Sequence, residues 1–507
     1  MAPDAQHPAA IPVAGTEAGA ATRANAPKLG PLKGVLTRGS VWALAGYGGS
    51  QVIRLGGNLV LWRLLYPKAF GIMAIVNVLM GGLQMFSDVG IGPSIIQNER
   101  GDDPVYLNTA WTIQAGRGIL LFLASLIAAA PVARFYGEPL MTAMIPVVGL
   151  GAVISGFNST ALFTTVRNVA LGRLTVIELV SQATGLLVTI AVAAIWKTVW
   201  GLVYGGLAAN LVRLVLGHVA LPGIRNRVVW DRGSAHTLMR FGRWIFLSTL
   251  LTFAVGQSDR LIFGKIVPIE LLGVYSIAAV WSSLPINILD RVFSSVLFPI
   301  LSRFEHVGSD FEKTFRQART PALLVAGWMS ACLIAGGPVL IRFLYDQRAV
   351  DAGWIVQALS VGTWLLALET TNSTALLARG QAKWMAIGSA AKLVGMFVAI
   401  PVGFITAGFR GAVVGFAVSE LLRYFTSVAG GFTIDLRSYW QDLKLSSAVA
   451  ATLGLGMLAG KGMHQVMAPL ILKHNRAEAF LEGLVIAAVV GLGWLGVRRL
   501  YGIRSHA

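Results

Sequence analysis

Charged side chains are scarce in this 507-residue chain, and their scarcity limits the class of protein it can be. Asp, Glu, Lys and Arg make up 13% of the residues, against about 25% in ordinary soluble proteins. Hydrophobic residues make up 55%, and apolar runs of roughly 20 residues, long enough to cross a bilayer core, follow one another along most of the chain. The polar stretches between these runs are too short to form a water-soluble domain. The sequence therefore predicts an all-α polytopic membrane protein.

Cysteine is almost absent as well. The single Cys332 excludes an intrachain disulfide and a cysteine-based metal cluster. The seven histidines are scattered without the spacing of metal ligands, so the sequence predicts no metal ion and no other cofactor. Residues 1–37 are rich in Ala, Pro and Gly and lack the apolar core of a signal peptide. They are predicted to form a flexible cytoplasmic tail.

The apolar runs predict fourteen transmembrane helices. These lie near residues 38–63, 70–92, 107–130, 139–163, 175–195, 197–221, 243–264, 272–302, 319–345, 352–378, 384–406, 410–433, 447–470 and 478–500. If the N-terminus is cytoplasmic, most Lys and Arg outside the helices fall on the cytoplasmic side, as the positive-inside rule requires. The net charge of +18 then reflects attraction to anionic lipid, and its dispersal around the spans argues against a nucleic-acid partner. Both termini are therefore expected in the cytoplasm.

The two halves of the chain repeat one another. Trp42 and Gly71 recur as Trp244 and Gly273, at an offset of 202 residues. The pairs Arg38/Arg240, Arg63/Lys265 and Asp88/Asp290 share that offset, and Arg173/Lys383, Gly201/Gly411, Gly205/Gly415 and Arg213/Arg423 share an offset of 210. Such repeats in an apolar chain are typical of transporters built from two similar bundles, whose substrate sites usually lie between the bundles near the membrane midplane.

The repeat divides the chain into predicted domains. An N-lobe of six helices covers residues 38–221, a central cytoplasmic loop covers 222–242, and a C-lobe of six helices covers 243–433. Because each lobe holds an even number of spans, the two lobes run parallel. Residues 434–507 hold two extra helices and a short cytoplasmic tail. The predicted fold is therefore about fourteen transmembrane helices, arranged as two parallel six-helix lobes plus two extra C-terminal helices.

Ionisable residues inside the spans are the candidates for function. A charge in hydrocarbon costs about 3 kcal/mol on insertion scales and normally faces a bundle interior or a wet cavity. Six cations are predicted to line a substrate cavity: Arg54, Arg117, Arg213, Arg260, Arg291 and Lys392. Four acids are candidates for gating or ion coupling: Asp88, Asp259, Asp290 and Glu369. A cavity dominated by cations favours an anionic substrate, such as one that carries phosphate.

Structural roles remain open for several of these residues. Asp88 and Asp290 lie toward the cytoplasmic ends of their spans, where they could serve at a helix end. Glu420 and Arg423, at positions i and i+3, could pair with each other. Arg213 could extend to the membrane interface. The charges are also placed asymmetrically in the repeat, since Arg54 aligns with Gly256 and Arg260 aligns with Asn58.

Two groups of segments bring in a family resemblance. The first group is Phe-Gly-Ile-Met-Ala-Ile at 70–75, Leu-Gln-Met-Phe-Ser-Asp-Val-Gly-Ile-Gly-Pro at 83–93 and Ile-Ile-Gln at 95–97. The second is Arg-Phe-Gly-Arg-Trp at 240–244, Asp-Arg-Leu-Ile-Phe-Gly-Lys at 259–265 and Leu-Gly-Val-Tyr-Ser-Ile-Ala at 272–278. Over roughly residues 36–500, the chain resembles the polysaccharide transporter branch of the multidrug/oligosaccharidyl-lipid/polysaccharide flippase superfamily.

This resemblance implies a flippase for oligosaccharide repeat units linked to undecaprenyl diphosphate. Such units are made on the cytoplasmic face of the bacterial inner membrane and polymerised outside it, as exopolysaccharide, capsule or O-antigen of lipopolysaccharide. The expected partners are this anionic lipid-linked substrate, membrane lipids, and a polysaccharide polymerase with its chain-length machinery. By similarity, Arg54, Arg117 and Lys392 correspond best to cations of the family's central cavity.

Two other functions are compatible with a polytopic chain. A multidrug or organic-cation antiporter of the same superfamily would carry acids in its cavity and twelve spans, whereas span 1 here carries Arg54 and no acid. A membrane-embedded polymerase or glycosyltransferase would need catalytic groups on sizeable external loops. The predicted external loops, such as 64–69 and 264–271, are only a few residues long, and no acid pair or nucleophile constellation is evident. We therefore expect a transporter without enzyme activity.

Overall fold

The structure is a computed structural model that describes residues 29–87, 90–168, 170–292, 311–467 and 476–500. The first half of the chain forms helices α2 (Leu29–Leu64), α3 (Pro67–Phe86), α4 (Ile91–Gln97), α5 (Pro104–Tyr136), α6 (Met141–Gly156), α7 (Ala161–Arg167), α8 (Leu171–Trp196) and α9 (Trp200–Val219). The second half forms α10 (Arg232–Ile266), α11 (Ile269–Ser282), α12 (Leu284–Val292), α14 (Phe311–Leu344), the short 3₁₀ helix η2 (Gln347–Ala349), α15 (Ala352–Ala378) and α16 (Lys383–Phe432). Helices α17 (Tyr439–Met467) and α18 (Arg476–Leu500) follow.

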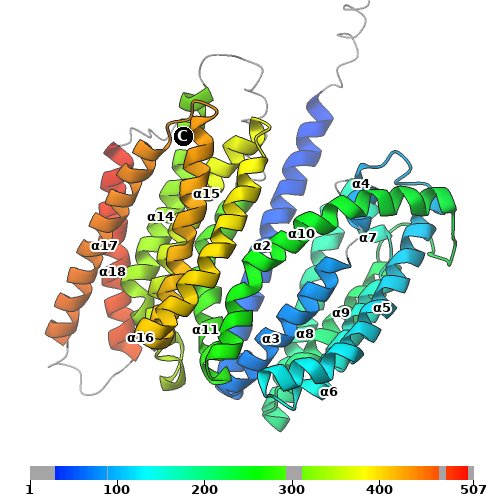
Figure 1. Ribbon diagram of the computed structural model, residues 1–507, viewed down its shortest axis with the longest axis horizontal. Coiled ribbons are helices and arrows are strands. Elements are labelled where there is room, and N and C mark those ends of the chain that lie inside the picture. The colour runs from blue at the N-terminus through cyan, green and yellow to red at the C-terminus, as the bar shows by residue number, and fades with distance from the viewer. Residues whose placement is uncertain (1–28, 88–89, 169, 293–310, 468–475, 501–507) are drawn as a thin grey trace, which may run out of the picture.

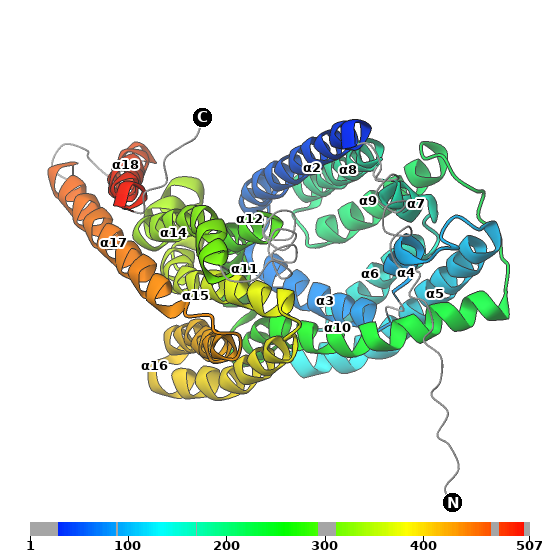
Figure 2. The ribbon, with the colours of Figure 1, turned by 90° about the horizontal axis from the view of Figure 1, so that it is seen from above.

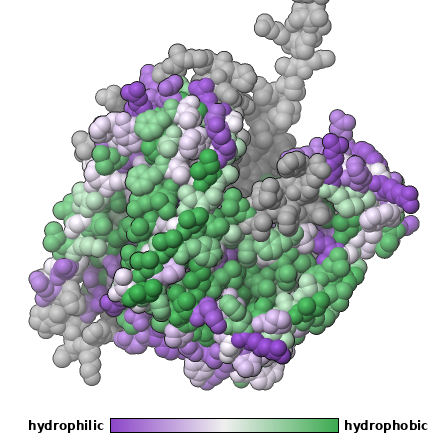
Figure 3. Space-filling view, viewed as in Figure 1, coloured by the Kyte–Doolittle hydropathy of each residue, from purple (hydrophilic) through white to green (hydrophobic). Residues whose placement is uncertain are grey.

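The described helices confirm an all-α polytopic fold. Nine of them are long and apolar enough to cross a membrane, or up to eleven if each of two bent pairs counts as one span. Helices α6 and α7 form one bent pair, with an angle of 59°, and α11 and α12 form the other, with an angle of 43°. Figure 3 shows hydrophobic side chains across the middle of the molecule and hydrophilic ones toward its upper and lower ends. This is the distribution that a surrounding bilayer requires.

Over its described residues, each of the fourteen predicted spans coincides with a helix or a bent pair, although α2 and α10 are not among the nine apolar helices. Residues 293–302 and 468–470 of two predicted spans lie outside the described residues. Helix α16 covers two predicted spans, 384–406 and 410–433, and breaks between them. Ala407 and Gly408 have non-helical backbone angles there, and Gly408 has a φ of 59°, which glycine adopts without a steric penalty. The count of fourteen spans is consistent with this arrangement and stays a prediction.

Several helices begin earlier than the sequence predicts, and α2 and α10 do so by the largest margin. Helix α10 begins at Arg232, inside the predicted loop 222–242, because the Asp231 side chain accepts a hydrogen bond of 2.8 Å from the Ser234 N–H and caps the helix. Helix α2 begins at Leu29, inside the segment predicted to be a tail. Capping and packing extend a helix beyond its apolar run, and hydropathy does not detect such extensions.

The repeat is visible in how glycines pack in each half. A Cβ added at Gly205 of α9 would lie 1.8 Å from the Thr189 hydroxyl of α8. In the second half, a Cβ at Gly415 would lie 2.2 Å from the carbonyl oxygen of Ala399, which is the counterpart of Thr189 at the offset of 210. The same small residues therefore allow close approach of the same helix pair in both lobes.

The two lobes meet where α3 crosses α11. A Cβ added at Gly71 would lie 2.0 Å from the carbonyl oxygen of Ile269, and one at Gly273 would lie 2.0 Å from that of Pro67. Gly71 and Gly273 are repeat counterparts, and so are Pro67 and Ile269, so the crossing is symmetric. A shared apolar core surrounds it, with Trp62, Phe70, Phe263, Leu272 and Tyr275 among its buried members. This contact closes one end of the molecule, which we call the α2–α3 side.

The remaining helices are arranged around this contact. Figure 1 shows α2 to α9 on one side, α14 to α16 on the other, and α10 running obliquely across the first lobe. Seen from above in Figure 2, α17 and α18 lie at the outer edge of the second lobe, away from the first. The two extra helices therefore do not contribute to the contact between the lobes.

A buried arginine joins several helices of the second lobe. Arg319 of α14 is fully buried and forms an ion pair with Asp442 of α17. Its guanidinium also donates hydrogen bonds to Gln441 (2.9 Å), Thr371 (3.2 Å) and Asn372 (2.8 Å). Tyr424 of α16 donates to the same carboxylate over 3.1 Å. Because every buried charge in this cluster has a partner, the cluster can hold four helices together without exposing an unpaired ion.

Candidate substrate cavity

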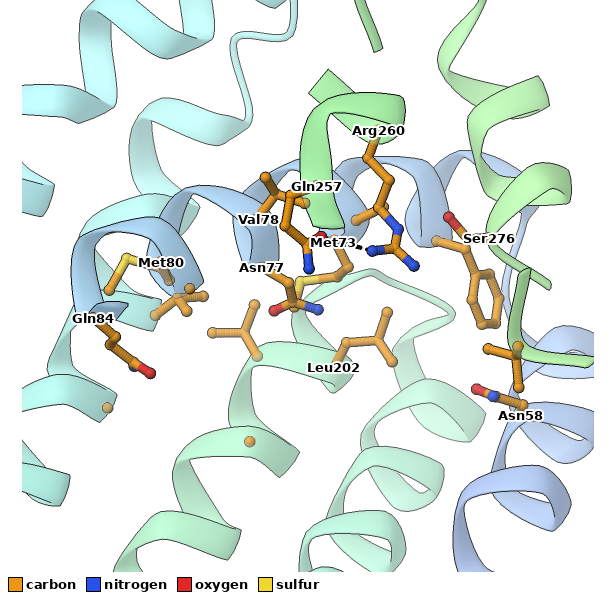
Figure 4. A pocket seen from close by; sticks show the side chains of 18 of the residues that line it. Asn58, Met73, Asn77, Val78, Met80, Gln84, Leu202, Gln257, Arg260 and Ser276 are labelled. Atoms are coloured by element: carbon orange, nitrogen blue, oxygen red, sulfur yellow. Dashed lines mark hydrogen bonds between the residues drawn. The ribbon is translucent and has the colours of Figure 1, made fainter. Parts of the chain in front are cut away.

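A cavity of about 700 Å³ lies between the first lobe and helices α10 and α11. Its wall is formed by residues of α2, α3, α6, α9, α10 and α11. Figure 4 shows Gln257, Asn77 and Arg260 near its centre, with Gln84 and Asn58 toward opposite ends. Arg260 donates a hydrogen bond of 2.6 Å to the Gln257 side chain, which holds the guanidinium at the cavity wall.

The cavity straddles the axis that relates the two halves. Three pairs of repeat counterparts line it together: Asn58/Arg260, Ala74/Ser276 and Val78/Val280. Equivalent positions of two parallel bundles can face one space only where the bundles meet. The offset found in the sequence therefore coincides with a shared cavity wall in the structure.

Away from this axis the cavity extends into the first lobe alone. Gly206 and Asn210 of α9 line it there. Their counterparts in the second lobe, at the offset of 210, are Phe416 and Glu420. Glu420 is buried in an ion pair with Lys392, whose ammonium lies 5.3 Å from the centre of the Phe416 ring. The Phe416 ring and the Lys392–Glu420 ion pair therefore fill, in the second lobe, the place that is part of the cavity in the first lobe.

A smaller cavity of about 300 Å³ adjoins the first, and Gln84 lines both. Arg117 of α5 and Arg213 of α9 line this second cavity. The Arg117 guanidinium donates to the Ser87 hydroxyl over 2.8 Å and to the Gln84 carbonyl oxygen over 2.6 Å, which fixes its position. Arg213 donates to Glu178 of α8 over 3.4 Å, and both side chains are partly exposed. Three of the six predicted cations, Arg117, Arg213 and Arg260, therefore line the two adjoining cavities.

The other predicted cations lie elsewhere. Lys392 is buried against Glu420 and does not line either cavity. Arg54 is exposed on α2, one helical turn before Asn58, so its side chain leaves the helix on the side that lines the larger cavity. Arg291 belongs to α12, but its side chain lies outside the described residues.

Two of the four predicted acids are buried, a third is exposed near a helix end, and the fourth lies outside the described residues. Asp259 is buried and accepts a hydrogen bond of 2.6 Å from the Tyr275 hydroxyl. Glu369 is buried and pairs with Arg423 over 3.3 Å. Glu420 and Arg423 thus pair with Lys392 and Glu369 rather than with each other. Asp290 is exposed near the end of α12, and Asp88 lies outside the described residues.

An interlobe contact that the sequence analysis missed closes the α2–α3 side. Arg348 of η2 donates to the carbonyl oxygens of Trp62 (2.9 Å) and Leu65 (3.1 Å), which lie at the end of α2. Asp346 accepts from the Trp62 indole N–H over 3.1 Å and from the Arg348 Nη2 over 2.6 Å. The last carbonyls of a helix lack partners within it and carry partial negative charge, so a guanidinium there caps the helix. We call these four residues the latch.

The amides of the larger cavity were not predicted, because an uncharged amide within a span stands out less from its sequence than a charged residue does. Asn77, Gln84, Asn210 and Gln257 lie within apolar spans. Asn58 could have been identified from the sequence, because the repeat aligns it with Arg260. The sequence indicated the latch more weakly, since Asp346 and Arg348 are an acid and a base two residues apart in the short connection between two spans.

Comparison with known proteins gives one family and several relatives. The model of the family described as "Polysaccharide biosynthesis protein" matches residues 60–352, which is more than half of the chain. The succinoglycan biosynthesis transport protein ExoT of Rhizobium meliloti is 21% identical over 300 residues, which cover 59% of this chain and 59% of ExoT. The lipopolysaccharide biosynthesis protein WzxC of Escherichia coli is 22% identical over 409 residues, which cover 78% of this chain and 82% of WzxC.

Solved structures show the same fold. The inward closed conformation of the lipid II flippase MurJ matches with a TM-score of 0.70 and 11% sequence identity, covering 92% of this chain and all of that one. An inward-facing multidrug resistance transporter of the MATE family matches with a TM-score of 0.52 and 16% identity, covering 81% of this chain and 95% of that one. At these identities the likeness concerns the arrangement of the helices.

Proposed function

Because the chain belongs to the family of polysaccharide biosynthesis proteins, we propose that it moves a diphosphate-linked oligosaccharide lipid across the bacterial inner membrane by alternating access. The observation that carries the proposal is a polar, arginine-bearing cavity at the interface of two repeated lobes. The names of the relatives support it, since one is a transport protein for succinoglycan biosynthesis and another acts in lipopolysaccharide biosynthesis. The expected carrier lipid is undecaprenyl diphosphate, and the product is exopolysaccharide, capsule or O-antigen.

The arginines of the two cavities suit the diphosphate. Guanidinium groups present several N–H donors in a fixed plane and match phosphate oxygens in pairs. Arg117 and Arg213 line the smaller cavity together, and Arg260 lines the adjoining one. Arg54, one turn from Asn58 on α2, would meet the substrate as it enters.

The proposed orientation is supported by the positive-inside rule. In this proposal the α2–α3 side faces out of the cell, so that the latch closes the external side while the substrate enters from the cytoplasmic leaflet. The α9–α10 connection, with Arg225 and Arg227, then lies in the cytoplasm together with both termini. Opening of the latch and closure of the opposite side would deliver the oligosaccharide to a polymerase and its chain-length machinery.

An organic-cation antiporter is the second candidate, and the cavity lining disfavours it. Among the described residues, Arg260 is the ionisable group that lines the larger cavity, and no carboxylate lines it with Arg260. A cationic substrate would therefore meet like charge. Catalysis of sugar transfer has no comparable support, whereas the relative ExoT is named a transport protein and the chain shares its helix arrangement with the flippase MurJ.

Reversing the charge of Arg117 or Arg54 should lower polymer export at least about tenfold. A charge-assisted hydrogen bond contributes about 1.5–3 kcal/mol, and a carboxylate in its place would repel the diphosphate. Surface polymer and the amount of tagged protein in the membrane would be measured for Arg117→Glu, Arg54→Glu and the control Arg225→Glu, which alters an exposed arginine outside the cavities. Normal export from both Arg117→Glu and Arg54→Glu would contradict the proposal.

A further inference from the structure

Most of the polar side chains that line the larger cavity are amides. Asn58, Asn77, Gln84, Asn210 and Gln257 line it, together with the hydroxyl of Ser276 and the guanidinium of Arg260. These amides come from α2, α3, α9 and α10, which surround the cavity on several sides. We call them the amide set. Five amides around one cavity, with a single cation, form a lining that is polar and nearly uncharged.

Most of the amide set is available to a ligand. The side chains of Asn58, Asn77, Gln84 and Asn210 form no hydrogen bond with any other residue that the structure describes, whereas Gln257 accepts one from Arg260. Each primary amide offers two donors and a carbonyl acceptor. Polar groups in a membrane protein normally find partners, so groups that face a cavity unpaired are suited to bind what enters it.

Sugar hydroxyls match this surface better than phosphate does. A hydroxyl is both a donor and an acceptor, and an amide can satisfy it in both directions. A diphosphate only accepts hydrogen bonds at neutral pH and would be opposed by the amide carbonyl oxygens. The guanidinium groups of Arg117 and Arg213, which only donate, lie in the smaller cavity. The volume of about 700 Å³ is also within the range of about 300–1,000 Å³ that small-molecule sites occupy.

In the second lobe the same place is filled by side chains. There Phe416 and the Lys392–Glu420 pair stand at the positions of Gly206, Gln182 and Asn210. In the first lobe, a Cβ added at Gly206 would meet nothing within 4 Å. The opening is therefore specific to one copy of the repeat, although both copies share the helix arrangement.

From these observations we infer that the amide set is the sugar-binding subsite, which recognises an uncharged, hydroxyl-rich oligosaccharide, while the diphosphate binds at Arg117 and Arg213. This inference rests on the proposed function and adds to it a division of the substrate between two cavities. Affinity for the lipid diphosphate and preference for the sugar are then set by different residues, and each can be altered separately.

The test compares two probes on the purified full-length protein in detergent: farnesyl diphosphate, and farnesyl diphosphate that carries a neutral disaccharide. Dissociation constants would be measured by calorimetry. The disaccharide should strengthen binding to the wild type. In Asn77→Leu/Asn210→Leu this gain should fall at least about tenfold, because each lost hydrogen bond to a sugar hydroxyl weakens binding several-fold, while affinity for farnesyl diphosphate stays unchanged. Arg117→Gln should weaken both probes by a similar factor.

A second variant tests the same subsite independently, in case the double variant fails to fold. Gly206→Phe places in the first lobe the residue found in the second, and its side chain has room to project into the cavity. It should abolish the gain from the disaccharide and keep affinity for farnesyl diphosphate. The matched control is Gly116→Phe in α5, where a Cβ also meets nothing within 4 Å but the residue lines neither cavity.

The possible failures can be told apart. Equal affinity of the wild type for both probes would overturn the sugar subsite and leave the proposed function standing. Equal weakening of both probes by the amide variants would overturn it as well, because the diphosphate would then occupy the amide set. Tighter binding of a uronic-acid disaccharide than of the neutral one would overturn the preference for uncharged sugar. If the wild type binds neither probe, the proposed function itself fails.

Discussion

Replacing Arg348 by alanine is expected to open the α2–α3 side of the protein. The substitution removes the guanidinium that caps α2 through the Trp62 and Leu65 carbonyl oxygens and that orients Asp346 toward the Trp62 indole. Hydrogen bonds to charged groups contribute about 1.5–3 kcal/mol, so the equilibrium between closed and open states should shift by roughly thirtyfold for a loss of about 2 kcal/mol. We expect the open state to lack these contacts, which is the condition for a residue to bias such an equilibrium.

Labelling of a cysteine in the cavity would measure this shift. In a Cys332→Ala background, Ser276→Cys places a thiol in the cavity wall, and a membrane-impermeant maleimide reports access from the α2–α3 side. Arg348→Ala should raise the labelling rate roughly thirtyfold, and Arg348→Lys should raise it less, because an ammonium keeps the charge but loses the planar fork. An unchanged rate in both variants would show that the latch does not hold this side closed.

The latch should also be insensitive to pH in the neutral range. Burial opposes ionisation of Asp346, but the hydrogen bonds from Arg348 and Trp62 outweigh it and leave the pKa of this carboxyl lowered. A lowered pKa means that the contribution of Asp346 is present above the ordinary carboxyl value of about 3.9 and is lost only as the pH falls below it. The ratio of the labelling rates of Arg348→Ala and the wild type should therefore stay constant between about pH 5 and about pH 8, since the pH dependence of the thiolate itself cancels in this ratio.

Replacing Arg319 by methionine is expected to destabilise the second lobe severely. The change leaves Asp442 buried without its ion pair and removes donors from Gln441, Thr371 and Asn372. Removing one partner of a buried ion pair costs about 3–5 kcal/mol. Thermal unfolding of the purified protein in detergent should therefore occur at a clearly lower temperature, with a lower yield from the membrane.

The same helix supplies the control. Arg316 lies one turn before Arg319 and pairs with Glu312 at 2.5 Å, but both side chains are substantially exposed. Arg316→Met should cost less than about 1 kcal/mol. The double variant Arg319→Met/Asp442→Leu should recover part of the lost stability, because it leaves no unpaired charge. Equal stability of Arg319→Met and Arg316→Met would show that the buried cluster does not hold the lobe together.

Much of the fold could be predicted from the sequence because hydropathy and repetition are local or periodic signals. Over its described residues, each predicted span coincides with a helix or a bent pair, and the offset that pairs Gly71 with Gly273 is the symmetry of the crossing between α3 and α11. The early start of α10 was not predictable from hydropathy, since it depends on the Asp231 cap within a polar segment. The break in α16 was expected between the two spans, and Gly408 gives its position.

The candidate site was predictable only in part. A charged residue within a span can either line a cavity or form a buried ion pair, and the sequence does not distinguish the two. Arg260 and Lys392 both lie within apolar spans, yet Arg260 lines the cavity and Lys392 is neutralised by Glu420. The difference depends on which side chain stands opposite, on a helix that is distant in sequence. Arg319 and Asp442 are 123 residues apart, and no spacing rule connects them. By contrast, the repeat shows directly that Arg260 stands in the second copy where Asn58 stands in the first, and both residues line the larger cavity.

Movement of the substrate between leaflets by the purified protein tests whether the oligosaccharide passes through the larger cavity. Proteoliposomes would carry a labelled undecaprenyl-diphosphate oligosaccharide in both leaflets, and membrane-impermeant periodate would oxidise the sugars exposed outside. We expect the wild type and Gly116→Phe to expose the inner-leaflet sugars to oxidation, and Gly206→Phe to leave them protected. Protection that is unaffected by the wild-type protein, or its loss with Gly206→Phe at the wild-type rate, would contradict passage of the oligosaccharide through this cavity.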